Sequence, residues 1–168
     1  MDINSLVGGA VQGAVLTFVA IAIPRYTRHI LAAVLVVAAL FYVRFALEAH
    51  TSAVWLAAEL AGVGIFGYVA LRGVRGSAWW LVAGWALHPI WDVALHYTGP
   101  GRAFAPASYT TSCLTFDLMV AGVTAIAILI GTHLSVSSLP RTTPTLLSAM
   151  RRSPCTCGGC TAAGARAA

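Results

Sequence analysis

Five apolar runs, each close to the length of a transmembrane helix, constrain the fold of this chain more than any other feature. They cover residues 6–23, 30–47, 53–71, 78–97 and 113–134. A helix needs about 20 predominantly apolar residues to cross a bilayer, and short connections make neighbouring helices antiparallel. The sequence therefore predicts an all-α integral membrane bundle of five transmembrane helices.

The composition excludes a soluble globular domain. Hydrophobic residues make up 59% of the 168 residues and charged residues only 9%, which is far from the usual balance of soluble proteins. We assign residues 1–140 to the transmembrane domain. Residues 141–168 are rich in Ser, Thr, Pro and Arg and then in Ala and Gly, so we expect a disordered tail. Five spans leave no room for a separate catalytic domain, and any function must lie among the helices.

All formal positive charge comes from arginine, and its placement predicts the orientation. Seven arginines fall on one side of a five-span arrangement, namely Arg25, Arg28, Arg72, Arg75, Arg141, Arg151 and Arg152. The positive-inside rule then puts the N-terminus outside and the C-terminus in the cytoplasm. Arginine-only basicity and Ala/Gly richness indicate a GC-rich bacterial genome but fix no compartment. We expect a multi-pass protein of the bacterial inner membrane, which is the cell membrane. The arginines form no patch, so we expect the lipid bilayer as partner and no nucleic acid.

Ionisable residues within the spans are expected to gather in the outer half of the bilayer. His88, Asp92 and His96 are spaced i, i+4, i+8 and share one helix face, and Glu59 and Asp117 fall at a similar depth. Each charge buried in a membrane costs about 2.5 to 3.5 kcal/mol even on lenient scales unless it is paired, ligated or hydrated. The sequence therefore predicts one buried polar cluster.

A metal site is the leading interpretation of this cluster. Imidazole and carboxylate ligands suit zinc, iron or manganese, and zinc is the first candidate. We take His88, Asp92 and His96 as metal ligands, although the two histidines are about 12 Å apart along the helix axis, which favours His88 and Asp92 as the pair. Glu59 and Asp117 are candidates to complete the site or act as catalytic base. The predicted surrounding shell or pocket consists of Arg44, Glu48, His50, Trp91 and Cys113.

Three functional hypotheses follow from the cluster. A metal-bound water would support hydrolysis of a lipophilic ester or amide. The same residues could instead carry protons or a divalent cation in a transporter subunit, which would need to oligomerise because five helices enclose little pathway. The third hypothesis is a scaffold whose polar network only fixes the helix packing. The tail cysteines Cys155, Cys157 and Cys160 have a spacing that could chelate a soft metal, but they lack the fourth ligand of a closed site.

The segment from Trp85 to His96, followed by a Gly/Pro-rich loop and by Cys113 and Asp117, resembles a family of small uncharacterised bacterial multi-pass membrane proteins. The resemblance covers the second to fifth spans and implies a membrane location without a known activity. A more distant likeness is to membrane zinc hydrolases of the alkaline ceramidase type, which also set histidines and acids among helices. The chain departs from them in having five spans instead of seven and no paired-histidine last helix, so hydrolysis is an analogy.

Overall fold

The computed structural model describes residues 2–131, and within this range every regular element is helical. The five α-helices are α1 (Ile3–Ala22), α2 (Thr27–Glu48), α3 (Ala53–Arg75), α4 (Trp79–Asp92) and α5 (Ala107–Leu129). A π-helical turn, Val93–Tyr97, continues α4, and a short 3-10 helix, Pro100–Ala103, lies in the loop before α5. The predicted tail with its three cysteines, and residues 132–134 of the predicted fifth span, lie outside the described residues.

The all-α prediction is confirmed for the described part of the chain. Helices α1, α2, α3 and α5 are each long and apolar enough to cross a membrane. Large apolar side chains on the outside of the bundle, such as Phe18, Leu60 and Ile126, are more than half exposed, which suits contact with lipid and not with water. The chain is therefore a multi-pass membrane protein. The fifth crossing, by α4 and its π-helical continuation, stays a prediction.

Helix α5 begins six residues before the predicted span. Pro106 precedes its first turn in an extended conformation, as suits a residue without an amide donor. The Thr110 and Thr111 hydroxyls donate to the carbonyls of Pro106 and Ala107 at 3.4 and 2.8 Å. The hydropathy pattern placed these polar residues in a loop, but their hydroxyl groups donate hydrogen bonds to backbone carbonyls one turn earlier.

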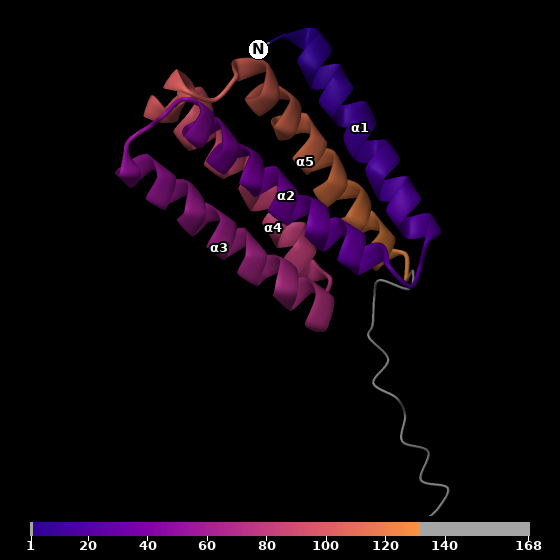
Figure 1. Ribbon diagram of the computed structural model, residues 1–168. Coiled ribbons are helices and arrows are strands. Elements are labelled where there is room, and N and C mark those ends of the chain that lie inside the picture. Colours follow the sequence, from indigo (N-terminus) through magenta and orange to yellow (C-terminus); the bar gives the residue numbers. More distant parts are fainter. Residues whose placement is uncertain (1, 132–168) are drawn as a thin grey trace, which may run out of the picture. The chain divides into compact units, whose positions relative to one another are not determined.

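Short glycine contacts bring α1 against α5. A Cβ at Gly13 would lie 2.5 Å from the Phe116 carbonyl oxygen, and one at Gly9 would clash with the Ser112 carbonyl. The other main packing pairs are α2 with α3 and α4 with α5, and Figure 1 shows α1 along α5 and α2 along α3. The core includes Leu31, Leu35, Trp85 and Val120. Small residues thus allow the close helix approach typical of membrane bundles.

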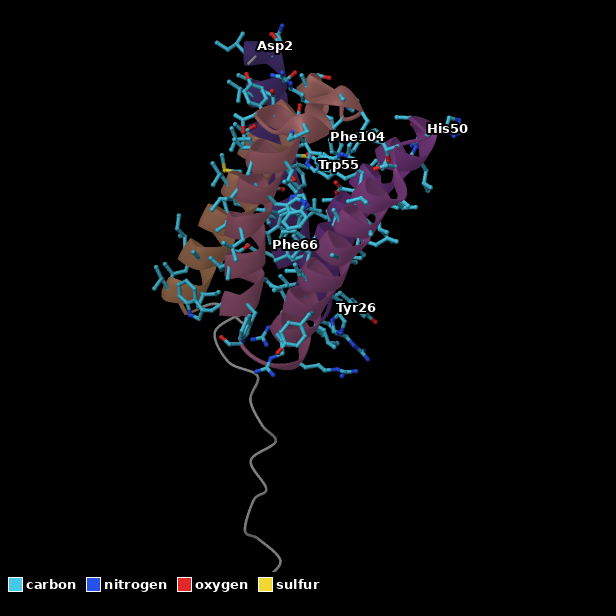
Figure 2. The ribbon with its side chains drawn as sticks, turned by 90° about the vertical axis from the view of Figure 1, so that its left-hand side faces the viewer. Asp2, Tyr26, His50, Trp55, Phe66 and Phe104 are labelled. Carbon is cyan, nitrogen blue, oxygen red and sulfur yellow. The ribbon has the colours of Figure 1, made fainter. Side chains whose placement is uncertain are left out.

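The connections alternate between the two ends of the bundle. Asp2, His50 and Phe104 lie at one end and Tyr26 lies at the other (Figure 2). Asp2 caps α1 by accepting from the Ser5 amide at 3.2 Å, and this amide holds the pKa of the exposed carboxyl below its usual value.

At the opposite end, Arg28 Nη1 donates to the Gly76 carbonyl at 2.8 Å. This bond joins the α1–α2 and α3–α4 connections, so Arg25, Arg28, Arg72 and Arg75 all belong to the same end. The side of the membrane that this end faces stays a prediction.

Candidate metal centre

The polar face of α4 points into the bundle. His88, Asp92 and His96 are at most 1% exposed, as the i, i+4, i+8 spacing predicted. His96 belongs to the π-helical turn Val93–Tyr97; such turns widen a helix locally and occur often at functional sites. The predicted buried cluster of histidine and acidic residues is confirmed.

Three of the buried side chains form one compact donor group, which we call the triad: His88, Asp92 and Asp117. The Nδ1 atom of His88 is 2.9 Å from Asp117 Oδ2 and 3.4 Å from Asp92 Oδ2. One donor atom from each residue lies within 4.8 Å of the other two. Zinc bonds of about 2.0 to 2.2 Å would place tetrahedral donors roughly 3.3 to 3.6 Å apart, so small side-chain shifts would let the triad hold one ion.

The triad has unused coordinating atoms. Both carboxylate oxygens of Asp92, Oδ1 of Asp117 and Nε2 of His88 are buried without a hydrogen-bond partner. Buried carboxylates are normally paired, hydrogen-bonded or bound to metal, because their desolvation is costly. Two ionised aspartates beside a neutral imidazole need two positive charges. One divalent cation or two protons would supply them.

Glu59 and His96 form a second, separate pair. Glu59 Oε1 lies 3.0 Å from His96 Nε2, and both side chains are buried. His96 was predicted as a ligand and Glu59 as a completing ligand or base, and the structure pairs them with each other outside the triad. Asp117, given the same role as Glu59, lies inside the triad.

Tyr42 of α2 joins the two groups, and the sequence reasoning missed it. Its ring stacks on His96 with centroids 3.8 Å apart and planes 16° apart. Its hydroxyl lies beside the side chains of Asp92 and Thr110. The available signal was a tyrosine within an apolar span. Because the span is apolar on every face, its pattern does not show whether Tyr42 faces the bundle or the lipid.

Aromatic side chains close the triad on the α3 side. Phe66 meets the His88 ring edge-on with centroids 4.7 Å apart, and Trp91 packs against Phe66 and Gly62. The narrow void between these residues, Tyr42 and Glu59 is too small for a water molecule. Trp91 thus lies in the wall of this void, which has no space for water beside the triad.

The predicted residues at the end of the second span do not join the cluster. Arg44 Nε is 2.7 Å from Glu48 Oε1, but both side chains are more than half exposed. His50 is exposed in the α2–α3 turn, with a positive φ of 50°. Arg44 and Glu48 lie on the outer face of α2, although Val43 and Ala46 beside them in the sequence are buried.

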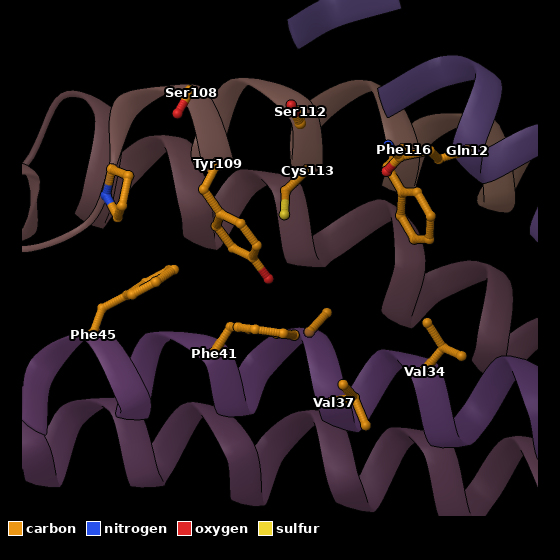
Figure 3. A pocket seen from close by; sticks show the side chains of 12 residues that line it. Gln12, Val34, Val37, Phe41, Phe45, Ser108, Tyr109, Ser112, Cys113 and Phe116 are labelled. Carbon is orange, nitrogen blue, oxygen red and sulfur yellow. The ribbon is translucent and has the colours of Figure 1, made fainter. Parts of the chain in front are cut away.

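A cavity of about 560 Å³, which we call the α2–α5 cavity, lies between α2 and the first half of α5 (Figure 3). Cys113 and Tyr109 belong to its wall, and Cys113 stands one helical turn before Asp117. The Cys113 thiol interacts electrostatically with Asp92 and Asp117. Cys113 thus lies in the wall of the cavity and close to the carboxylates of the triad.

No curated protein and no solved structure matches the chain. A family match covers residues 4–132, which include all five helices and every residue of the cluster. The resemblance expected from the His, Asp and Cys motifs was to a family without an established activity, and the match agrees with this. The chain belongs to DUF6010, a family of unknown function.

Proposed function

We propose that this protein is a membrane-embedded, metal-dependent hydrolase of a lipophilic ester or amide, with a divalent cation, zinc foremost, bound by the triad. The observation that supports it most is the set of three fully buried donors with unpartnered carboxylate oxygens on Asp92. A divalent cation would neutralise both aspartates, which removes the main cost of burying them. Imidazole and carboxylate donors suit zinc.

The hydrolytic role follows from the number of donors. His88, Asp92 and Asp117 would hold the ion, and a divalent cation bound there would supply an activated water for hydrolysis. The substrate would come from the α2–α5 cavity, because the void on the α3 side admits not even water. Cys113 and Tyr109 would have to move aside for it to reach the triad.

Metal analysis tests the first half of this proposal. Purified wild-type protein should contain about one equivalent of zinc, iron or manganese, because a three-donor site binds one ion. Asp92→Asn and His88→Ala should lose it. Glu48→Gln, which alters only an exposed ion pair, is the matched control and should keep it. A chain truncated before Cys155 should also keep the metal, because the triad and not the thiols of the tail would hold it.

If folded wild-type protein still contains no metal after it is supplied with these ions, both the metal site and the hydrolase proposal are overturned. If metal is bound, hydrolysis of neutral lipid esters and amides by the loaded protein is compared with the Asp92→Asn variant. Equal rates in the two would overturn the hydrolase and leave the metal site standing.

A transport role is the second candidate, and one arrangement favours it. Buried polar side chains form a continuous series from the Glu59–His96 pair through Tyr42 to Asp92 and His88. Such series mark proton and ion pathways in membrane proteins. Metal or proton flux in proteoliposomes, absent with Asp92→Asn, would support transport; a strictly monomeric protein without flux would exclude it.

A further inference from the structure

The α2–α5 cavity is partly open to the surroundings of the bundle, and α2 and α5 on either side of it are both long and apolar enough to cross a membrane. Helix α1 packs along α5 and contacts α2 only slightly, and Figure 1 shows α5 between α1 and α2. The cavity is lined by residues of these three helices and is partly open. Any occupant that enters sideways must therefore come from the lipid.

The two walls of the cavity differ in chemistry. The α2 wall presents Val34, Val37, Phe41 and Phe45 (Figure 3), which give an apolar surface suited to a hydrocarbon chain.

The α5 and α1 side adds uncharged hydrogen-bonding groups, Ser108, Tyr109, Ser112 and Gln12. No charged side chain lines the cavity among the described residues. A charged headgroup would therefore find no counter-ion, whereas an ester or amide group would find donors for its carbonyl oxygen.

The volume also fits a chain-sized ligand. About 560 Å³ lies within the usual range of pockets that enclose small organic molecules. It would leave little room for two long chains side by side. We infer that the α2–α5 cavity binds the single hydrocarbon chain of a neutral ester or amide lipid, with the carbonyl group against the polar α5 wall. This inference names the substrate class of the proposed hydrolase and depends on that function for turnover, though not for binding.

Photo-crosslinking in nanodiscs tests this directly. The probe is a monoacylglycerol with a diazirine in its chain and an alkyne tag, and labelled peptides are identified by mass spectrometry. We expect saturable labelling confined to α2 and α5. Unlabelled monoacylglycerol should compete, and the corresponding ionised fatty acid should compete far less.

Two variants fill the cavity and one provides the control. Ala38→Phe projects a ring from the α2 wall, and Val37→Trp does so from a position that is 48% exposed and tolerant of change. Ala33→Phe places the same ring on the exposed face of α2. Labelling should fall by at least about tenfold in the first two, equivalent to 1.4 kcal/mol, and stay unchanged in Ala33→Phe.

Unsaturable labelling spread over all helices would overturn the inference, as would wild-type labelling in Val37→Trp. Metal content is measured on the same samples to keep the two proposals apart. Saturable labelling without metal would refute the hydrolase and retain the lipid site. Bound metal with unsaturable labelling would refute the lipid site and retain the metal centre.

Discussion

His88 on α4 and Asp117 on α5 lie 29 residues apart in the sequence, and their side chains meet at 2.9 Å in the interior of the bundle. The Nδ1 atom of His88 faces Asp92 as well, at 3.4 Å. One imidazole nitrogen thus stands between two carboxylates that are fully buried. A divalent cation or protons must balance the negative charge of these two carboxylates.

Asp117→Asn keeps the shape of the side chain and removes one negative charge from the triad. We expect loss of bound metal, because a neutral amide oxygen is a poor zinc ligand compared with a carboxylate. Elemental analysis measures this. A variant that retains a full equivalent of metal would show that Asp117 is not a ligand.

Glu59→Gln should separate the two buried groups. The change weakens the hydrogen bond to His96, so we expect the free energy of unfolding to fall by about 1 to 3 kcal/mol, as is usual for a buried hydrogen bond to a charged group. Metal content should stay at the wild-type level because Glu59 lies outside the triad. Thermal unfolding and elemental analysis on one sample would check both; loss of metal at unchanged stability would place Glu59 in the site.

Tyr42→Phe retains the ring that stacks on His96 and removes the hydroxyl beside Asp92. We expect metal affinity to fall roughly 10- to 100-fold, the usual effect of losing a group that orients a ligand. Competition with a chelator of known affinity measures it. Leu40→Ala, at an exposed position of the same helix, serves as the control. An unchanged metal affinity in Tyr42→Phe would show that Tyr42 does not support the metal centre.

Gly13→Ala and Gly8→Ala form a matched pair on α1. The new methyl at position 13 would meet the Phe116 carbonyl at 2.5 Å, whereas at position 8 nothing lies within 4 Å. Overpacking should cost the first variant about 1 to 3 kcal/mol, and the second should gain slightly from helix propensity. Unfolding in mixed detergent would show the order; equal stabilities would mean that α1 does not depend on this contact.

Membrane orientation can be tested with single cysteines at Ser52 and Ser77, both exposed and at opposite ends of the bundle. The native cysteines are first replaced by serine. The positive-inside rule predicts that an impermeant maleimide labels Ser52→Cys in intact cells, and Ser77→Cys only after permeabilisation. The reverse pattern would invert the proposed topology.

The sequence by itself determined the solvent of this protein and the buried polar face of α4. Runs of apolar residues near the spanning length require a helix in lipid, since only intrahelical bonds can satisfy the backbone there. The i, i+4, i+8 spacing then fixed one buried face of α4, including His88 and Asp92. These inferences need only the period of a helix and the cost of burying charge.

Only the tertiary structure decided which partners meet. The rotation of α3 and α5 about their axes pairs His96 with Glu59 and His88 with Asp117, and apolar spans carry too little periodic signal to predict such rotations. The same packing leaves Arg44 and Glu48 on the surface, adds Tyr42 to the cluster and opens the α2–α5 cavity. Side-chain fit between helices sets these features, because burial of apolar surface cannot orient helices that are already surrounded by lipid.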